Sequence, residues 1–156
     1  MSSDRVLQPT APVEQRIAAL QSVLEQRGPG MAEAIEELGL TLPKHHRHLV
    51  VLENTATVQN VICCTQCSCT AFTLIGLPPH WYKDLEYRAR VVRESRTVLK
   101  EMGLVLGPDV EIRVWDTTAD TRYMVLPERP AHTAGWTEAQ LVGAVTRDAL
   151  IGVARL

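Results

Sequence analysis

The four cysteines of the chain lie together in one short segment, and their spacing is the sequence feature with the most specific chemistry. They are Cys63, Cys64, Cys67 and Cys69, and the last three follow the pattern Cys-x-x-Cys-Ser-Cys. This spacing places three sulfur atoms within reach of one ion, together with the backbone nitrogens of Ser68 and Cys69. Because thiolates are soft donors, we expect a tightly bound transition metal rather than magnesium or calcium.

The residues alone leave three interpretations of this segment open: a mononuclear metal site, a redox pair or iron–sulfur cluster, and a structural role without metal. A thioredoxin-like pair of Cys64 and Cys67 would need a helix that starts at its first cysteine, but the threonines and serine around it are poor helix formers. Structural zinc sites and iron–sulfur clusters usually take their cysteines from separated stretches of chain. The compact spacing therefore favours a mononuclear site.

The donor set of such a site would be unusual. Two thiolates and two deprotonated amides form a strongly donating, near-planar set, and Cys64 could close it from the axial side. This set favours a trivalent, low-spin ion such as cobalt or iron, and it leaves one coordination position open. An open position is typical of a catalytic metal, which acts as a Lewis acid or activates water. The bound thiolates are also candidates for sulfenic and sulfinic oxidation.

Length, composition and charge place limits on the function. A chain of 156 residues suits one domain with a hydrophobic core. It is 46% hydrophobic and 22% charged with a formal net charge of −2, so no nucleic-acid partner is expected. The N-terminus has no apolar signal core, and no run approaches the roughly 18 apolar residues of a membrane helix. We therefore expect a cytoplasmic protein without a membrane partner, where clustered cysteines more often bind metal than form disulfides.

The sequence divides into two parts. Residues 1–47 are expected to form an N-terminal extension and helical arm, with helices at 13–26 and 31–38. Glycine and proline at 28–30 end the first of these helices. Residues 48–156 are expected to form the metal-binding catalytic domain. This domain mixes helices and strands, so the predicted fold class is α+β.

Hydrophobic periodicity predicts the elements of this domain. Strands are expected at 48–53, 58–63, 110–115 and 122–126, and helices at 81–102 and 137–150. The first two strands should flank a turn at Asn54, and the last two should form a pair. Thr137 and Gln140 fit a capping box at the start of the last helix. The buried face of the long helix is expected to carry Leu85, Ala89, Val92, Leu99 and Met102.

The cysteine segment and its surroundings resemble the nitrile hydratase α-subunit family. Residues 61–69 are similar to the metal loop of that family. Further blocks match in the same order, at 52–55, 76–83, 86–94, 111–116, 122–130, 146–148 and 151–154. The metal-bound γ subunit of thiocyanate hydrolase belongs to the same family. The resemblance implies a layered α/β body of the nitrile hydratase α-subunit kind, here with a short helical arm.

The resemblance also implies a role for each residue of the loop. Cys64 is similar to the axial thiolate ligand, Cys67 to the position that becomes sulfinic acid, and Cys69 to the position that becomes sulfenic acid. Ser68 and Cys69 supply the two amide nitrogens. Thr65 resembles the cobalt type of the family, where the iron type usually has serine. The implied cofactor is one cobalt(III) ion per chain, with iron(III) less favoured.

The implied activity is that of a lyase, which hydrates a nitrile to the corresponding amide. The ion would polarise the nitrile carbon, and either water or the sulfenate oxygen of Cys69 would attack it. The residues do not choose between these nucleophiles. Two other functions stay open: hydrolysis of thiocyanate at the same site, and a non-catalytic chain that stores or delivers cobalt.

The resemblance further implies a heteromer with a β-type subunit. In the family, two arginines of that subunit pair with the oxidised sulfurs, which are buried anions that require charged partners. Four arginines of this chain lie on the helix with Arg88 and Arg96, whose outer face we expect to be solvated, so a partner chain should supply the pairing arginines. The arm is shorter than in the family, which suggests two different partner chains, as in the three-subunit toyocamycin nitrile hydratase.

Several residues depart from the family pattern or invite another function. Cys63 stands where valine is usual, and we interpret it as a small buried residue at a strand end. Residues 70–73 replace a stretch that commonly carries tryptophan and proline, which would alter the substrate pocket. Glu53 and Asp116 lie at strand ends, where either could anchor a loop by hydrogen bonds. The histidines between residues 45 and 48 are interpreted as part of a solvated linker.

Overall fold

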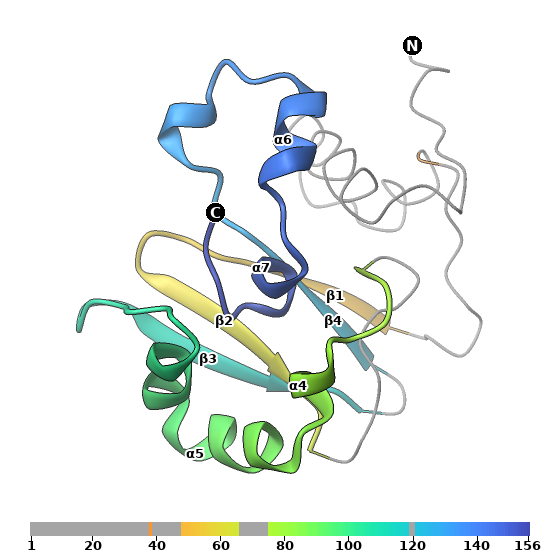
Figure 1. Ribbon diagram of the computed structural model, residues 1–156, viewed down its shortest axis with the longest axis vertical. Helices are drawn as coiled ribbons and strands as arrows, with labels where there is room; N and C mark the ends of the chain where they lie inside the picture. Colours follow the sequence, from red (N-terminus) through yellow and green to blue (C-terminus); the bar gives the residue numbers. More distant parts are fainter. Residues whose placement is uncertain (1–37, 39–47, 66–74, 119–120) are drawn as a thin grey trace.

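The structure is a computed structural model that describes residues 38, 48–65, 75–118 and 121–156 (Figure 1). Its elements follow in the order β1 (His48–Glu53), β2 (Val58–Cys63), α4 (His80–Lys83), α5 (Leu85–Glu101), β3 (Glu111–Asp116), β4 (Thr121–Leu126), the 3-10 helix η2 (Ala131–Thr133), α6 (Glu138–Ala144) and α7 (Arg147–Ile151). In Figure 1 the strands lie between α5 on one side and α6 on the other. The predicted α+β fold class is confirmed.

All four predicted strands are present, but the predicted pairing of the last two is wrong. β1 pairs with β4 and β2 pairs with β3, both in parallel. β1 and β2 flank a turn without pairing along their lengths, and Thr55 and Val58 form an isolated bridge there. Parallel strands need long connections, and the segment between β2 and β3 contains α4 and α5. Hydrophobic periodicity predicts which face of a strand is buried, but it does not identify the neighbouring strand.

The parallel register brings two carboxyl ends to the same edge of the β2–β3 pair. Cys63 at the end of β2 lies opposite Asp116 at the end of β3. Residues 53 positions apart in the sequence therefore become neighbours where the cysteine segment begins. A hairpin pairing of β3 with β4 would have placed Asp116 beside another strand instead.

The helix predicted at 81–102 is divided into α4 and α5. Asp84 has an extended backbone conformation between them, and its side chain accepts a hydrogen bond from the backbone nitrogen of Glu86 at 3.0 Å. Aspartate is a strong N-cap residue, so it begins a new helix rather than continuing the first one. A second interruption lies within α5, where Glu94 has φ −139° and ψ 48°. Gly103 follows the helix with φ 99°, which confirms the predicted stop.

These interruptions change which side chains of α5 are buried. Leu85 and Val92 were expected in the core, but they are 73% and 47% exposed. Of the predicted face only Leu99 is fully buried. The buried residues are instead Tyr87, Val91, Val98 and Leu99. The predicted buried face is therefore wrong, because it assumes one continuous helix over 81–102. The helix in fact restarts at Asp84 and bends at Glu94.

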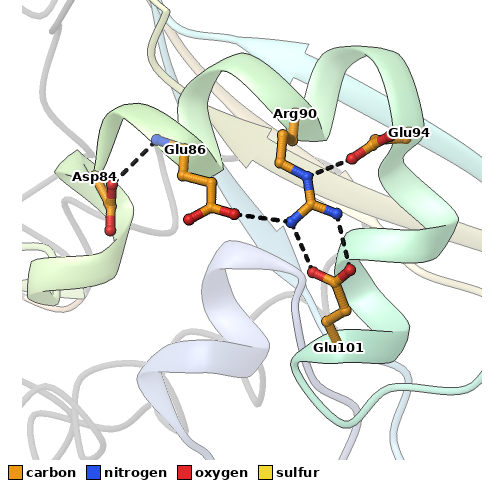
Figure 2. Close-up of polar contacts among 5 residues, drawn as sticks. All are labelled: Asp84, Glu86, Arg90, Glu94 and Glu101. Atoms are coloured by element: carbon orange, nitrogen blue, oxygen red, sulfur yellow. Dashed lines mark hydrogen bonds and ion pairs between the residues drawn. The ribbon is translucent and has the colours of Figure 1, made fainter.

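An ion-pair cluster spans the bend of α5 (Figure 2). Arg90 binds both carboxylate oxygens of Glu101 at 2.8 Å, and it also contacts Glu86 and Glu94. Glu86 and Glu94 lie before or at the bend, and Glu101 lies after it. Arg90 thus connects the two halves of the helix on its outer side.

The C-terminal helix predicted at 137–150 is also divided, into α6 and α7. The predicted capping box is confirmed, because Thr137 and Gln140 exchange hydrogen bonds between side chain and backbone. Val145 is extended, and the Thr146 hydroxyl then accepts a hydrogen bond from Ala149 to begin α7. Gly152 ends α7 with φ 98°, and a Cβ at this residue would lie 1.9 Å from the carbonyl oxygen of Asn60. The end of α7 therefore packs directly against the backbone of β2.

The hydrophobic core forms between the strands and the helices that contact them. α5 contacts β2 and β3, and α7 contacts β2 and β4. Leu38 is fully buried and belongs to this core, whereas the rest of the predicted arm lies outside the described residues. The division of the chain at residue 47 therefore stays a prediction, as does the cytoplasmic location. No helix in the described part of the chain is long and apolar enough to cross a membrane.

Candidate metal centre

The described part of the cysteine segment begins at the end of the buried strand β2. Cys63 is 0% exposed and Cys64 is 1% exposed. The preceding residue is held from the helix side, because the hydroxyl of Tyr87 donates a hydrogen bond to the carbonyl oxygen of Ile62 at 2.8 Å. The cysteine segment therefore starts from a strand end that is packed in the core and fixed by α5.

Asp116 holds the first residue after the two cysteines. The backbone nitrogen of Thr65 donates a hydrogen bond to Asp116 Oδ1 at 2.8 Å, and the Thr65 hydroxyl donates to Asp116 Oδ2. The sulfur of Cys63 lies 3.9 Å from Asp116 Oδ1. The prediction that Asp116 anchors a loop is confirmed. The register of β2 against β3 provides this contact, because it places Asp116 directly beside the strand end.

Arg88 of α5 also holds this segment, a contact that no motif in the sequence indicates. Its Nε donates a hydrogen bond to the carbonyl oxygen of Cys64 at 2.8 Å, and its Nη2 donates to that of Thr65 at 2.7 Å. Arg88 is half-buried and therefore does not belong to the solvated outer face expected for this helix. The sequence signal for this contact is Asp84, a favourable N-cap residue. A helix that begins there places residues 87 and 88 on the side of β2.

Cys63 and Cys64 differ in their surroundings, although they are adjacent. Burial, followed by the negative charge of Asp116, raises the pKa of the Cys63 thiol to about 12. Cys63 is thus a buried neutral thiol, and its interpretation as a small residue at a strand end is confirmed. Cys64 instead lies close to the hydroxyl of Tyr82, and burial raises the pKa of that phenol above its ordinary value. The two adjacent thiols therefore have different polar neighbours, a carboxylate beside Cys63 and a phenol beside Cys64.

The residues that the structure describes fit the first ligand of the predicted metal site. Cys64 offers a soft sulfur that is screened from water, at a strand end fixed by Asp116 and Arg88. The other predicted ligands, Cys67, Ser68 and Cys69, lie outside the described residues. Within the described ranges, no group of three His, Cys, Asp or Glu side chains could hold an ion elsewhere.

The comparison with known proteins identifies the family. The model of the family described as "Nitrile hydratase, alpha chain" matches residues 23–154. The low-molecular weight cobalt-containing nitrile hydratase subunit alpha of Rhodococcus rhodochrous is 59% identical over 105 residues, which cover 67% of this chain and 51% of that protein. Thiocyanate hydrolase subunit gamma of Thiobacillus thioparus is 49% identical over 112 residues, which cover 72% of this chain and 46% of that protein.

A solved structure supports the same relationship. The fold is similar to that of a double mutant of the Fe-type nitrile hydratase from Comamonas testosteroni Ni1, with a TM-score of 0.81 and 55% sequence identity. That similarity covers 92% of this chain and 71% of the other. The chain spans about half the length of the two curated relatives. Since the family match extends over most of the chain and includes the cysteine segment, the chain belongs to the nitrile hydratase α-chain family.

Proposed function

We propose that the chain is the metal-binding subunit of a nitrile hydratase, which adds water to a nitrile to form the corresponding amide. The observation that carries this proposal is the position of Cys64. It lies buried at the end of β2, Arg88 binds its carbonyl oxygen and that of Thr65, and it is the first residue of the Cys-x-x-Cys-Ser-Cys pattern in a chain of this family. A rigid strand end of this kind suits the first ligand of a catalytic metal.

The proposed cofactor is one cobalt(III) ion, bound by the sulfurs of Cys64, Cys67 and Cys69 and by the amide nitrogens of Ser68 and Cys69. The name of the Rhodococcus rhodochrous relative describes it as cobalt-containing, and Thr65 in this chain is the residue expected of the cobalt type. Iron(III) is the second choice, because a similar solved structure is described as Fe-type. We further propose that Cys67 is oxidised to sulfinic acid and Cys69 to sulfenic acid.

The residues of the chain would have different roles in such a site. When bound, the ion supplies Lewis acidity toward the nitrile. Cys64 anchors the segment in the core, while Asp116 and Arg88 fix the backbone on either side of Thr65. Cys69 is the proposed catalytic residue, because the oxygen on its sulfur would lie next to the reacting carbon. Water remains the alternative nucleophile.

We propose a β-type nitrile hydratase subunit as the partner, and two different partner chains, because the sequence lacks the longer helical insertion that the family carries between the first helix and Glu53. Two apolar side chains on either side of α4, Leu77 and Leu85, are 72% and 73% exposed. Burial against another chain would remove this apolar surface from water. Oxidised sulfurs in a buried site also need positive charges, which a second subunit can supply.

Thiocyanate hydrolysis is the second candidate, because thiocyanate hydrolase subunit gamma is 49% identical to the chain. The test is a steady-state assay of the chain co-expressed with a β-type partner in cobalt-supplemented cells. We expect amide formation from at least one nitrile, and slower turnover of thiocyanate. Turnover of thiocyanate alone would move the assignment to the second candidate. Inactivity of a cobalt-loaded, correctly oxidised complex toward every nitrile and toward thiocyanate would favour a cobalt carrier.

A further inference from the structure

We infer that Arg88 is a positioning residue for the metal centre, which orients the first ligand and supplies positive charge from within the chain. This role rests on the proposed function, since it concerns the same site. It differs from the pairing of partner arginines with oxidised sulfurs, because Arg88 binds the backbone of the segment. The expected effect is on metal affinity and on the electronic environment of the metal.

The geometry is that of a clamp made by adjacent residues of α5. Tyr87 donates a hydrogen bond to the carbonyl oxygen of Ile62, and Arg88 donates to those of Cys64 and Thr65. The helix therefore binds three carbonyl groups within residues 62–65, which run from the end of β2 into the cysteine segment. A guanidinium has its donors in a rigid plane, so it can fix two carbonyl groups relative to each other, which a flexible ammonium cannot do.

The charge of Arg88 also distinguishes it from its neighbour Arg90. Arg90 is surrounded by three glutamates and its charge is compensated on the outer surface. Arg88 has no ion pair with any carboxylate of the described residues, and the two atoms that accept its hydrogen bonds there are neutral carbonyl oxygens. Its positive charge therefore lies beside the carbonyl groups of Cys64 and Thr65, without a carboxylate of the described residues to compensate it.

That centre would have a negative formal charge, because three thiolates and two deprotonated amides exceed the charge of a trivalent ion. Anionic groups that are removed from water need a nearby cation, and the interaction grows stronger as the local dielectric constant falls. Cys64 is 1% exposed, so the segment begins in such an environment. Arg88 thus contributes both geometry and charge at the point where the ligand set starts.

The experiment is an anaerobic titration of the metal-free assembled protein with Co²⁺, followed by absorption of the sulfur-to-metal charge-transfer band. We expect Arg88→Ala to weaken Co²⁺ binding about tenfold, as the loss of charged hydrogen bonds predicts, and to shift the band. Arg88→Lys keeps the charge without the planar fork, and should bind Co²⁺ with an affinity between those of wild type and Arg88→Ala. Arg93→Ala is the control, because Arg93 is exposed on the same helix and, among the described residues, its side chain bonds only to the carbonyl oxygen of Ala89.

Wild-type affinity and an unchanged band in Arg88→Ala would overturn the inference. If Arg88→Ala does not fold, Arg88→Lys decides the question: weaker binding at an unchanged melting temperature supports the role, and wild-type binding overturns it. An equal loss of affinity in Arg93→Ala would also overturn it, since the loss of any positive charge on the helix would then explain the weaker Co²⁺ binding. Wild-type protein that binds no Co²⁺ would contradict the proposed function itself.

Discussion

Cys63 and Cys64 are adjacent and both buried, but their side chains have different neighbours. Cys63 faces Asp116 on the neighbouring strand, and Cys64 faces Tyr82. Burial, and then the carboxylate of Asp116, opposes ionisation of the Cys63 thiol and raises its pKa to about 12. The proposed ligand is Cys64, because Cys63 precedes the Cys-x-x-Cys-Ser-Cys pattern.

Serine substitutions test this difference. Cys67→Ser or Cys69→Ser should abolish activity and strongly reduce the cobalt content, because each removes a proposed sulfur ligand. Cys63→Ser should retain cobalt and most activity, since Asp116 can accept a hydrogen bond from the new hydroxyl. We expect it to cost about 1–2 kcal/mol of stability, the usual consequence of burying a hydroxyl. Elemental analysis and thermal denaturation of the variants provide the measurements.

Equal loss of cobalt from Cys63→Ser would show that the ligand set has been assigned wrongly.

The contact between Arg88 and Cys64 could not be predicted from the spacing of residues. This contact depends on where α5 begins, and the capping by Asp84 decides that. A repeating apolar pattern alone does not contain this information.

At the scale of elements, the close approach of α7 to β2 is one of the strictest requirements of the fold. Gly152→Ala would place a Cβ 1.9 Å from the Asn60 carbonyl oxygen, at a residue whose φ is already 98°. We expect a loss of roughly 2 kcal/mol or more, because backbone strain and a backbone clash coincide. Chemical denaturation measures this loss.

Gly143→Ala is the matched control for that variant. Gly143 lies in α6, and a Cβ there meets nothing within 4 Å. Alanine in a helix should be neutral or stabilising by up to about 1 kcal/mol. A Gly152→Ala protein as stable as wild type would contradict the packing of α7 against the strand.

The ion-pair cluster of α5 gives a prediction about pH. The hydrogen bond from Arg90 holds the pKa of Glu101 below its ordinary value of 4.5. The pair therefore stabilises the fold above pH 4.5, and this contribution is lost as the pH falls through the lowered pKa. Arg90→Gln should melt at a lower temperature than wild type at pH 7, and the difference should disappear in acid and shrink in high salt.

Arg93→Gln provides the comparison, since Arg93 forms no ion pair within the described ranges. A difference between Arg90→Gln and wild type that persists unchanged below the pKa of Glu101 would rule out this origin. The bend at Glu94 itself was not predictable from periodicity, because no proline or glycine marks it. Arg90 bonds to glutamates before and after the bend, so it connects the two halves of the helix.

At the scale of the whole molecule, the sequence predicted the kinds of element and their order far better than their arrangement. The strand bounds follow from short apolar runs, and β1 and β2 begin and end where predicted. The pairing depends on contacts between distant segments, so the parallel neighbours Cys63 and Asp116 could not be identified from local patterns. The family and its cysteine segment were recognisable, because ligand spacing is a local property of the chain.

X-ray absorption at the cobalt K-edge of the purified, assembled protein tests the central claim most directly. We predict about one cobalt per chain in a shell of sulfur and nitrogen neighbours, with one sulfur fewer in any cobalt that Cys64→Ser still binds. A shell of oxygen and nitrogen neighbours alone, or a cobalt spectrum that is identical in Cys64→Ser, would contradict the assignment of the metal to this segment.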